Sequence, residues 1–268
     1  MKNILTIAGS DSSGGAGIQA DLKTFAALGT YGMSVITAVT AQNTCGVSKV
    51  QNIDPEIVKA QIDAIFDDIR VDAIKIGMVS DIEIIKVIVE RLRFYEPPIV
   101  VLDPVMISKS GYYLLAEDAC DILIKELLPL ATLVTPNLPE ATAITGQNIY
   151  NKIDMVIAAR KIAQLGVKNV LVKGGHLDNR ADDLLYKDEL EIWFEENHIE
   201  TQNTHGTGCT LSSALAVFLA QGETMENAVR ASKQYVTTGI RHGLPIGKGQ
   251  GPLHHFVSLY AKAGYTVK

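Results

Sequence analysis

The residues best suited to chemistry in this sequence lie between positions 203 and 211, where two glycines, three threonines and one cysteine stand together. They lead into a predicted helix at 210–221, which Gly222 would end. Glycines let successive backbone N–H groups converge on one point, and a helix N-terminus adds the positive end of its dipole. Such a turn binds an anion, most often phosphate, and a thiol placed there ionises more readily than a free one. The segment therefore predicts phosphoryl transfer with Cys209 as a base; the alternative is a tight loop around a buried cysteine.

A second glycine-rich segment, 9–17, follows the first predicted strand and opens a helix. It nearly has the P-loop spacing, but Gly15 and Ala16 stand where a lysine and a hydroxyl residue are required, and it lacks the dinucleotide spacing G-x-G-x-x-G. It predicts either the floor of a small-substrate site, which Gly9 and its neighbours allow a ligand to approach closely, or a flexible turn capped by a serine. Asp21, one turn into the helix, then either points its carboxylate at the ligand or is a favourable first-turn charge.

Two acids and one lysine stand at the ends of predicted strands. Asp103 follows the apolar run 99–102, and Glu140 ends the segment 135–140. Mg2+ prefers one or two carboxylates together with water and phosphate oxygens, so this pair suits a hydrated Mg·ATP. Otherwise Asp103 is a cap before a proline, and Glu140 is a first-turn charge of a helix that begins near Asn137. Lys173 precedes two glycines, where its ammonium either balances charge on transferring phosphoryl oxygens or is solvated.

Composition limits the classes of function. The chain has 268 residues, 47% of them hydrophobic and 20% charged, which suits one large globular domain. The net charge of −6 and the lack of a basic run argue against nucleic-acid binding. No apolar run is long enough to span a membrane, and a strand-like run directly after Met1 argues against a signal peptide. The three cysteines lack C-x-x-C spacing, so we expect neither disulfides nor a structural zinc site, and we expect a cytoplasmic protein.

Short β-type runs alternate with helical patterns along the whole chain. Strands are predicted at 3–8, 33–40, 72–76, 98–102, 132–135 and 168–172, followed by a hairpin of 183–186 and 189–194 that turns at 187–188. Helices are predicted after Asp54, an N-cap followed by Pro55, and at 81–95, 117–128, 152–165 and 225–240. This alternation predicts an α/β fold with a mostly parallel central sheet, covered by helices on both faces, in a single domain spanning 1–268.

The carboxyl ends of the strands carry glycine, acid or amide residues, whereas their amino ends do not. Open α/β sheets bind ligands outside the carboxyl ends of their strands. We therefore expect six strand ends to line one crevice: 9–11, 41–43, 77–78, 103–104, 136–137 and 173–176. The segment 43–53 is a candidate lid, because Gly46 and polar residues interrupt its apolar pattern.

Seven segments, in the same order and covering nearly the whole chain, resemble the ribokinase-like superfamily and, within it, the hydroxymethylpyrimidine/phosphomethylpyrimidine kinase family of thiamine biosynthesis. They are residues 8–24, 38–44, 75–78, 103–106, 135–141, 172–176 and 204–210. The resemblance implies a three-layer α/β/α fold and transfer of the γ-phosphoryl group of ATP to 4-amino-5-hydroxymethyl-2-methylpyrimidine and then to its monophosphate, with Mg2+ as the metal. It also implies a homodimer, and it leaves open a requirement for a monovalent cation such as K+.

On the substrate side, the resemblance implies a pocket for the pyrimidine ring. Asp21 and Gln42 would hydrogen-bond the ring, and Met78 and Val105 would pack on it. The amide of Gln42 both donates and accepts, which matches a ring nitrogen beside an exocyclic amine.

On the nucleotide side, the resemblance implies an anion hole formed by Gly206, Thr207 and Gly208, with Cys209 in the place where related sugar kinases carry an aspartate base. The groups that would face the phosphates and the metal are Lys173, Asn137, Glu140 and Asp103. For the adenine pocket, the candidates are the residues after Lys173 and the helix around Lys233.

Three other functions fit parts of the sequence. The nearest is a pyridoxal or pyridoxine kinase of the same subfamily, against which Gln42 favours the pyrimidine. A non-catalytic nucleotide or phosphometabolite sensor would keep the crevice without chemistry, but the base, the metal acids and the lysine are all present. An NAD-dependent oxidoreductase on a doubly wound sheet lacks the glycine spacing that it needs.

Overall fold

The computed structural model describes residues 1–106, 117–175, 177 and 180–266. Its centre is an eight-stranded sheet in the order β10-β9-β8-β7-β6-β5-β1-β2. The pairs from β2 across to β8 are parallel, and β9 is antiparallel to both of its neighbours. The bounds are β1 Asn3–Ala8, β2 Tyr31–Ile36, β5 Ala73–Ile76, β6 Val100–Leu102, β7 Leu133–Val134, β8 Asn169–Val172, β9 Asp183–Lys187 and β10 Leu190–Phe194.

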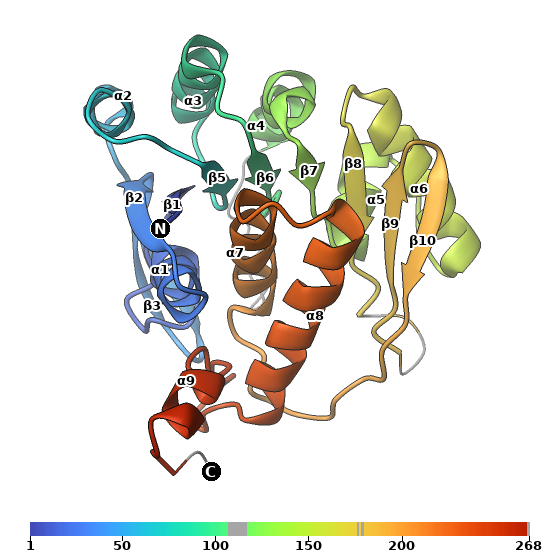
Figure 1. Cartoon of the computed structure of the whole chain (residues 1–268). Coiled ribbons are helices and arrows are strands. Elements are labelled where there is room, and N and C mark those ends of the chain that lie inside the picture. The colour runs from blue at the N-terminus through green and yellow to red at the C-terminus, as the bar shows by residue number, and fades with distance from the viewer. Residues whose placement is uncertain (107–116, 176, 178–179, 267–268) are drawn as a thin grey trace.

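Helices cover both faces of the sheet (Figure 1). One face carries α2 Pro55–Phe66, α3 Ile82–Tyr95, α4 Glu117–Ile122, α5 Leu138–Thr145 and α6 Lys152–Gln164. The other carries α1 Gly17–Ala27, α7 Thr207–Ala220 and α8 Met225–Arg241, and a short helix, α9 Val257–Lys262, lies near the C-terminus.

The two faces form separate hydrophobic cores because strand side chains alternate in direction. In β1, Leu5 and Ile7 join the core under α2 and α3, whereas Ile4 joins the core under α1 and α7. The central strands are therefore apolar on both faces, which is typical of a parallel sheet covered on both sides. The predicted α/β/α fold is confirmed. Within the part of the chain that the structure describes, no helix has the length and apolar character needed to cross a bilayer.

The predicted strand 33–40 is wrong as a single element. It is divided between β2, which belongs to the large sheet, and β3 Ala38–Asn43, which pairs with β4 Gly46–Asn52 in a separate two-stranded sheet. The break falls at Thr37, whose backbone N–H donates to Ala8 O at 3.0 Å and whose hydroxyl donates to Met78 O at 2.8 Å. The chain thus leaves the large sheet where its neighbours end. The candidate lid 43–53 is the turn and second strand of this β3–β4 hairpin.

Two further boundaries differ from the prediction. The hairpin between β9 and β10 turns at Asp188 and Glu189, which both have positive φ, rather than at 187–188. The predicted helix 117–128 is α4 followed by a π-helical turn at Leu123–Leu127 and a 3-10 turn at Leu128–Leu130. Of the predicted strand-end residues, His176 lies outside the described part of the chain.

Candidate active site

The predicted phosphate-binding turn is the first turn of α7. This helix begins at Thr207, three residues before its predicted start, so Gly208 and Cys209 lie in its first turn. Gly206 caps it with φ 80°, and a Cβ there would lie 1.7 Å from Gly15 O, so the turn packs directly on the glycine loop. The first N–H groups of a helix have no partner inside the helix, and the dipole adds positive potential. The turn therefore suits an anion.

The glycine loop is held by a carboxylate that the sequence placed at a strand end but to which it assigned no role. Asp11 accepts hydrogen bonds from the backbone N–H groups of Ser13, Gly15 and Ala16 at 2.8–3.0 Å, and His205 Nε2 lies 2.8 Å from its Oδ2. Burial alone would raise its pKa, but the hydrogen bonds from His205 and Ser13 hold the pKa of Asp11 well below its usual range. Because an ionised carboxylate only accepts, His205 Nε2 carries a proton and donates. The signal for this role was the position of Asp11 directly after the first strand.

Cys209 lies between the two loops, with the backbone N–H of Gly17 donating to its sulfur. Burial raises the pKa of the Cys209 thiol to about 11; Lys75 opposes this rise, and Asp21 and Asp103 add to it. The prediction that the start of a helix would ease its ionisation is therefore wrong for the protein without ligands. Loss of hydration outweighs the helix dipole here.

Lys173 lies between the two predicted metal acids. Its Nζ is 2.7 Å from Asp103 Oδ1 and 4.0 Å from Glu140 Oε2. A Cβ on Gly208 would lie 3.4 Å from Asp103 Oδ2 and 3.5 Å from Lys173 Nζ, so these charges stand directly beside the anion-binding turn. Burial would lower the pKa of Lys173, but Asp103 and Glu140 raise it. Burial raises the pKa of Glu140 to about 7; Lys173 lowers it, and Asp103 raises it further.

Asn137 and Glu140 form a reciprocal cap at the start of α5. Asn137 Oδ1 accepts from Glu140 N at 2.9 Å, and Glu140 Oε2 accepts from Asn137 N at 2.8 Å. The predicted helix start is confirmed. No cluster of three or more His, Cys, Asp and Glu side chains in the described ranges is placed to hold a metal. Two carboxylates beside a phosphate site nevertheless fit Mg2+, which keeps several waters and takes ligands from phosphate.

The residues predicted for the substrate line the neighbouring strand ends. A Cβ on Gly9 would lie 2.4 Å from Met78 Cε, so the missing side chain makes room for Met78. Gln42 is half-buried on β3, with its Nε2 3.5 Å from His205 Nε2, and Val105 is half-buried two residues after Asp103. Gly9, Met78, Gln42 and the anion-binding segment thus lie together.

Asp21 requires a correction, because its carboxylate has no exposed surface. Both of its oxygens lie 2.9 Å from Lys75 Nζ, and the hydroxyls of Thr6 and Ser213 donate to them at 2.6 and 2.7 Å. These bonds use the acceptor capacity of a carboxylate, so Asp21 cannot hydrogen-bond a substrate in this structure. Lys75 was missed, although a lysine inside the apolar strand 72–76 was a signal.

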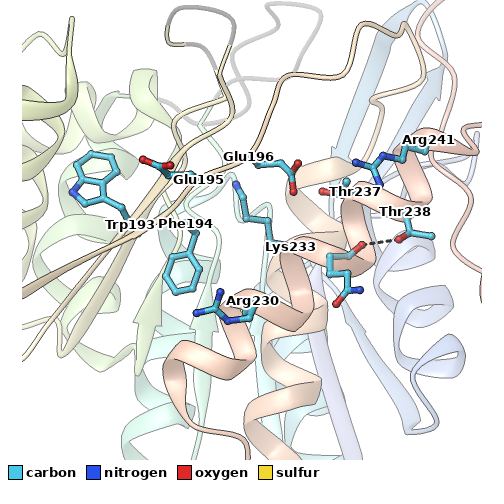
Figure 2. A pocket seen from close by; sticks show the side chains of 10 residues that line it. Trp193, Phe194, Glu195, Glu196, Arg230, Lys233, Thr237, Thr238 and Arg241 are labelled. Atoms are coloured by element: carbon cyan, nitrogen blue, oxygen red, sulfur yellow. Dashed lines mark hydrogen bonds between the residues drawn. The ribbon is translucent and has the colours of Figure 1, made fainter.

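A hollow of about 680 Å³ lies between the end of β10 and α8 (Figure 2). Its lining includes Trp193, Glu195, Glu196, Arg230, Lys233 and Arg241. The ammonium of Lys233 donates to Asp183 Oδ2 at 2.6 Å, and Asp183 Oδ1 accepts from Gly174 N at 3.0 Å. Lys233, predicted for the adenine pocket, thus lies next to the segment after Lys173, although the Lys233 ammonium is already paired with Asp183.

Thr207, predicted for the nucleotide side, has its hydroxyl bonded inside the protein: it donates to Thr204 O at 2.6 Å.

Comparison with known proteins identifies relatives over almost the whole chain. The family model described as phosphomethylpyrimidine kinase matches residues 11–254. A hydroxymethylpyrimidine/phosphomethylpyrimidine kinase of Rhizobium meliloti is 53% identical over 94% of this chain and 96% of its own length. The thiamine biosynthesis bifunctional protein ThiED of Geobacter sulfurreducens is 48% identical over 96% of this chain, which spans only 52% of that relative.

Solved structures of similar proteins have the same fold. A phosphomethylpyrimidine kinase from Clostridium difficile is 55% identical with a TM-score of 0.80, covering 88% of this chain and 98% of that one. A pyridoxal kinase from Bacillus subtilis, solved as an ADP complex, is 40% identical with a TM-score of 0.89, covering 95% of this chain and 97% of that one.

Proposed function

Since this chain belongs to the phosphomethylpyrimidine kinase family, we propose that its reaction takes place where the start of α7 meets the glycine loop. The chain is a phosphotransferase that uses ATP to phosphorylate 4-amino-5-hydroxymethyl-2-methylpyrimidine and its monophosphate in thiamine biosynthesis. One observation carries the location. A Cβ placed on Gly208 would lie 3.4 Å from Asp103 Oδ2 and 3.5 Å from Lys173 Nζ, and Cys209 is the next residue.

The chain's own groups then divide the work. The N–H groups of Gly208 and Cys209 bind phosphoryl oxygens, and Lys173 balances the charge that develops on them. Asp103 and Glu140 would hold Mg2+, which supplies positive charge to the phosphates when bound. Cys209 accepts the proton of the substrate hydroxyl as the new oxygen–phosphorus bond forms. Holding the alcohol in line with the γ-phosphate supplies much of the rate.

The hollow between β10 and α8 is proposed to hold the adenosine part of ATP. Strand β10 runs parallel to β8, since both are antiparallel to β9, so its end and Lys173 lie at the same edge of the sheet. Asp183 links Gly174 to Lys233 in the hollow's wall, which supports one continuous nucleotide site from the phosphates to the base. Asn137 borders this path, because it forms a parallel bridge with Lys173.

The pyrimidine is proposed to lie over Gly9 and Met78, facing Gln42. An amide that donates and accepts can match an aminopyrimidine, which supports this substrate over pyridoxal. The structural likeness to a pyridoxal kinase makes that alcohol the proper competitor. The test is to supply ATP, Mg2+ and each alcohol in turn, compare kcat/KM, and look for mono- and diphosphate products. A larger kcat/KM for pyridoxal, or no phosphorylated pyrimidine, would overturn the assignment.

We also propose a cytoplasmic homodimer. No disulfide joins the three cysteines within the described residues, which suits a reducing compartment. The separate β3–β4 sheet leaves Val39 about half exposed (49%), and the outer edge of β4, which pairs with no further strand among the described residues, accepts a second copy. Light scattering on the purified chain tests the dimer. The kinase assay with Mg2+ chelated, and with K+ replaced by Na+, tests the two cations.

A further inference from the structure

A buried ion pair lies inside the layer that carries the anion-binding turn. Lys75 in β5 and Asp21 in α1 both have side chains with no exposed surface, and Lys75 Nζ is 2.9 Å from each Asp21 oxygen. Burying two charges is expensive, and well-packed apolar residues often replace such a pair without loss of stability. A pair of this kind therefore calls for an explanation beyond stability.

The pair is aligned with Cys209 along two packed helices. The backbone N–H of Gly17 contacts the Cys209 sulfur, and Ser213 Oγ donates to Asp21 Oδ1 at 2.7 Å. Asp21 follows Gly17 by four residues in α1, and Ser213 follows Cys209 by four residues in α7. Since four residues are about one helical turn, the ion pair lies one turn below the thiol.

The Lys75 ammonium extends toward the crevice rather than away from it. A Cβ on Gly77 would lie 2.7 Å from Lys75 Nζ, so this cation reaches the level at which β5 ends. Among the described residues, the charged groups that act on the Cys209 sulfur include Lys75 from β5, Asp21 from α1, Asp103 after β6 and Lys173 after β8. Lys173 is held by Asp103 and lies beside the phosphate site, whereas Lys75 is fully buried and acts on the sulfur from within the protein.

We propose that Lys75 is a positioning residue of the phosphoryl-transfer site: its buried ammonium is the fixed positive charge that stabilises the Cys209 thiolate, and Asp21 holds that ammonium in place. In the step it supports, the hydroxyl O–H bond of the alcohol breaks, its proton passes to the sulfur, the oxygen bonds to the γ-phosphorus, and ADP leaves. Lys75 touches none of the reacting atoms. The inference rests on the proposed role of Cys209 as the base.

The test measures thiol ionisation without ATP or substrate. Iodoacetamide alkylation of Cys209 is followed by peptide mass spectrometry between pH 7.5 and 9.5, with exposed Cys45 as the internal reference. In this range the rate is proportional to the thiolate fraction. Lys75→Met removes the cation and should slow alkylation of Cys209 about tenfold, because a rise of about one unit in the pKa of the thiol lowers the thiolate fraction by that factor. Asp21→Asn removes the opposing anion and should accelerate it by a similar factor.

The opposite signs separate an electrostatic role from a structural one. Loosened packing would accelerate both variants, and a general loss of folding would affect Cys45 as well. Lys75→Arg keeps the charge and should restore most of the wild-type rate. If the two neutral variants change the Cys209 rate in the same direction or not at all, the proposal is wrong. Where circular dichroism shows that Lys75→Met does not fold, Asp21→Asn decides alone, and an unchanged or slower rate overturns it.

The same measurement keeps this inference distinct from the assignment of the reaction. If the two variants shift the alkylation rate in opposite directions but the wild-type chain phosphorylates neither alcohol, the role of the ion pair stands and the proposed function is wrong. If the variants show opposite shifts but Cys209→Ala turns over normally, Lys75 does stabilise the thiolate, and the sulfur has no part in the mechanism.

Discussion

At the scale of single residues, the proposed chemistry depends on the environment of one sulfur atom. Cys209 lies in the first turn of a helix and contacts a backbone N–H, which both favour a thiolate, yet its burial and two nearby carboxylates keep its pKa at about 11. The protein without ligands therefore holds a neutral thiol at pH 7. Thiolate becomes available only in a small fraction of molecules, and that fraction grows about tenfold for each unit of pH.

Cys209→Ala should therefore lower kcat by about 100- to 10,000-fold, the usual range for loss of a general base, while KM for the alcohol changes little. In single-turnover experiments the wild-type rate should rise between pH 7 and 9, because the pKa of the thiol lies above this range. The alanine variant should lose that dependence, and Cys209→Ser should remain slow because a hydroxyl ionises less readily. Near-normal turnover in the alanine variant would contradict the assignment.

At the scale of elements, the start of α5 combines a structural and a functional demand. Glu140 completes the capping box with Asn137, and its carboxyl group is buried beside Asp103. Its pKa of about 7 lies above the usual 4.5, so the folded state binds the proton more tightly than the unfolded state. Stability from this group is therefore full below about pH 4.5 and is lost as the pH rises to about 7.

Glu140→Gln should stabilise the protein and inactivate it. Glutamine keeps the capping box and resembles the protonated acid, so the free energy of unfolding at pH 8 should rise by about 1 to 3 kcal/mol without Mg2+. The gain should shrink toward pH 5, and kinase activity should fall because a metal ligand is lost. Urea unfolding at both pH values measures this. The exposed first-turn acid of α2 offers a control, Glu56→Gln, which should show no such gain; a less stable Glu140→Gln at pH 8 would contradict the prediction.

The β3–β4 hairpin is the element that presents Gln42, and its tip is fixed by a later loop. Thr44 O accepts from Gln250 N at 2.9 Å, and Thr44 Oγ1 accepts from Gly249 N at 3.1 Å. A Cβ on Gly249 would lie 2.1 Å from Thr44 O, which is too close for any side chain. The position of the Gln42 amide thus depends on a glycine about 200 residues away in the sequence.

Gly249→Ala should raise KM for the pyrimidine about tenfold or more, since small displacements of a positioning group reduce catalysis strongly. KM for ATP should stay within about twofold, because the nucleotide side does not touch this contact. Steady-state kinetics with each substrate varied in turn measures both constants. Lys49→Ala, on the exposed side of the same hairpin, should leave both unchanged. An effect on ATP alone would show that the hairpin does not position the pyrimidine.

Local sequence signals predicted most elements but not the break between β2 and β3. Asp54 and Pro55 were sufficient to place the start of α2, because a cap and a proline act within one turn. The run 33–40 has strand propensity throughout, and only the end of β1 and the hydrogen bonds of Thr37 divide it. Those partners are distant in sequence, so no local pattern reports them.

At the scale of the whole molecule, parallel topology explains how much of the site was predictable. The carboxyl ends of parallel strands must meet at one edge, which was enough to bring Asp103 and Lys173 together. Topology does not say which side chains will be buried. Asp21 faces Lys75 instead of the ligand, and the Cys209 thiol stays neutral, because contacts between β5, α1 and α7 determine both.

The continuous sheet also bears on the expected single domain. Eight hydrogen-bonded strands run without interruption from β10 to β2, and each hydrophobic core spans most of that width. The glycine loop lies on one half of this sheet and the hollow beside α8 on the other. A nucleotide and an alcohol bound at the proposed sites would therefore contact both halves. We therefore expect one cooperative thermal transition, because neither half keeps a complete core without the other.

Calorimetry is run without ligands, with a non-hydrolysable ATP analogue and Mg2+, with the alcohol alone, and with all of them together, and each addition should move that one transition upward. A ligand at about 100 times its Kd stabilises the native state by about 2.7 kcal/mol, and this gain applies to the whole cooperative unit. Lys173→Met should reduce the shift caused by the nucleotide but not the shift caused by the alcohol alone. Two separate transitions, of which the nucleotide moves only one, would instead show that the chain folds as two domains that meet at the crevice.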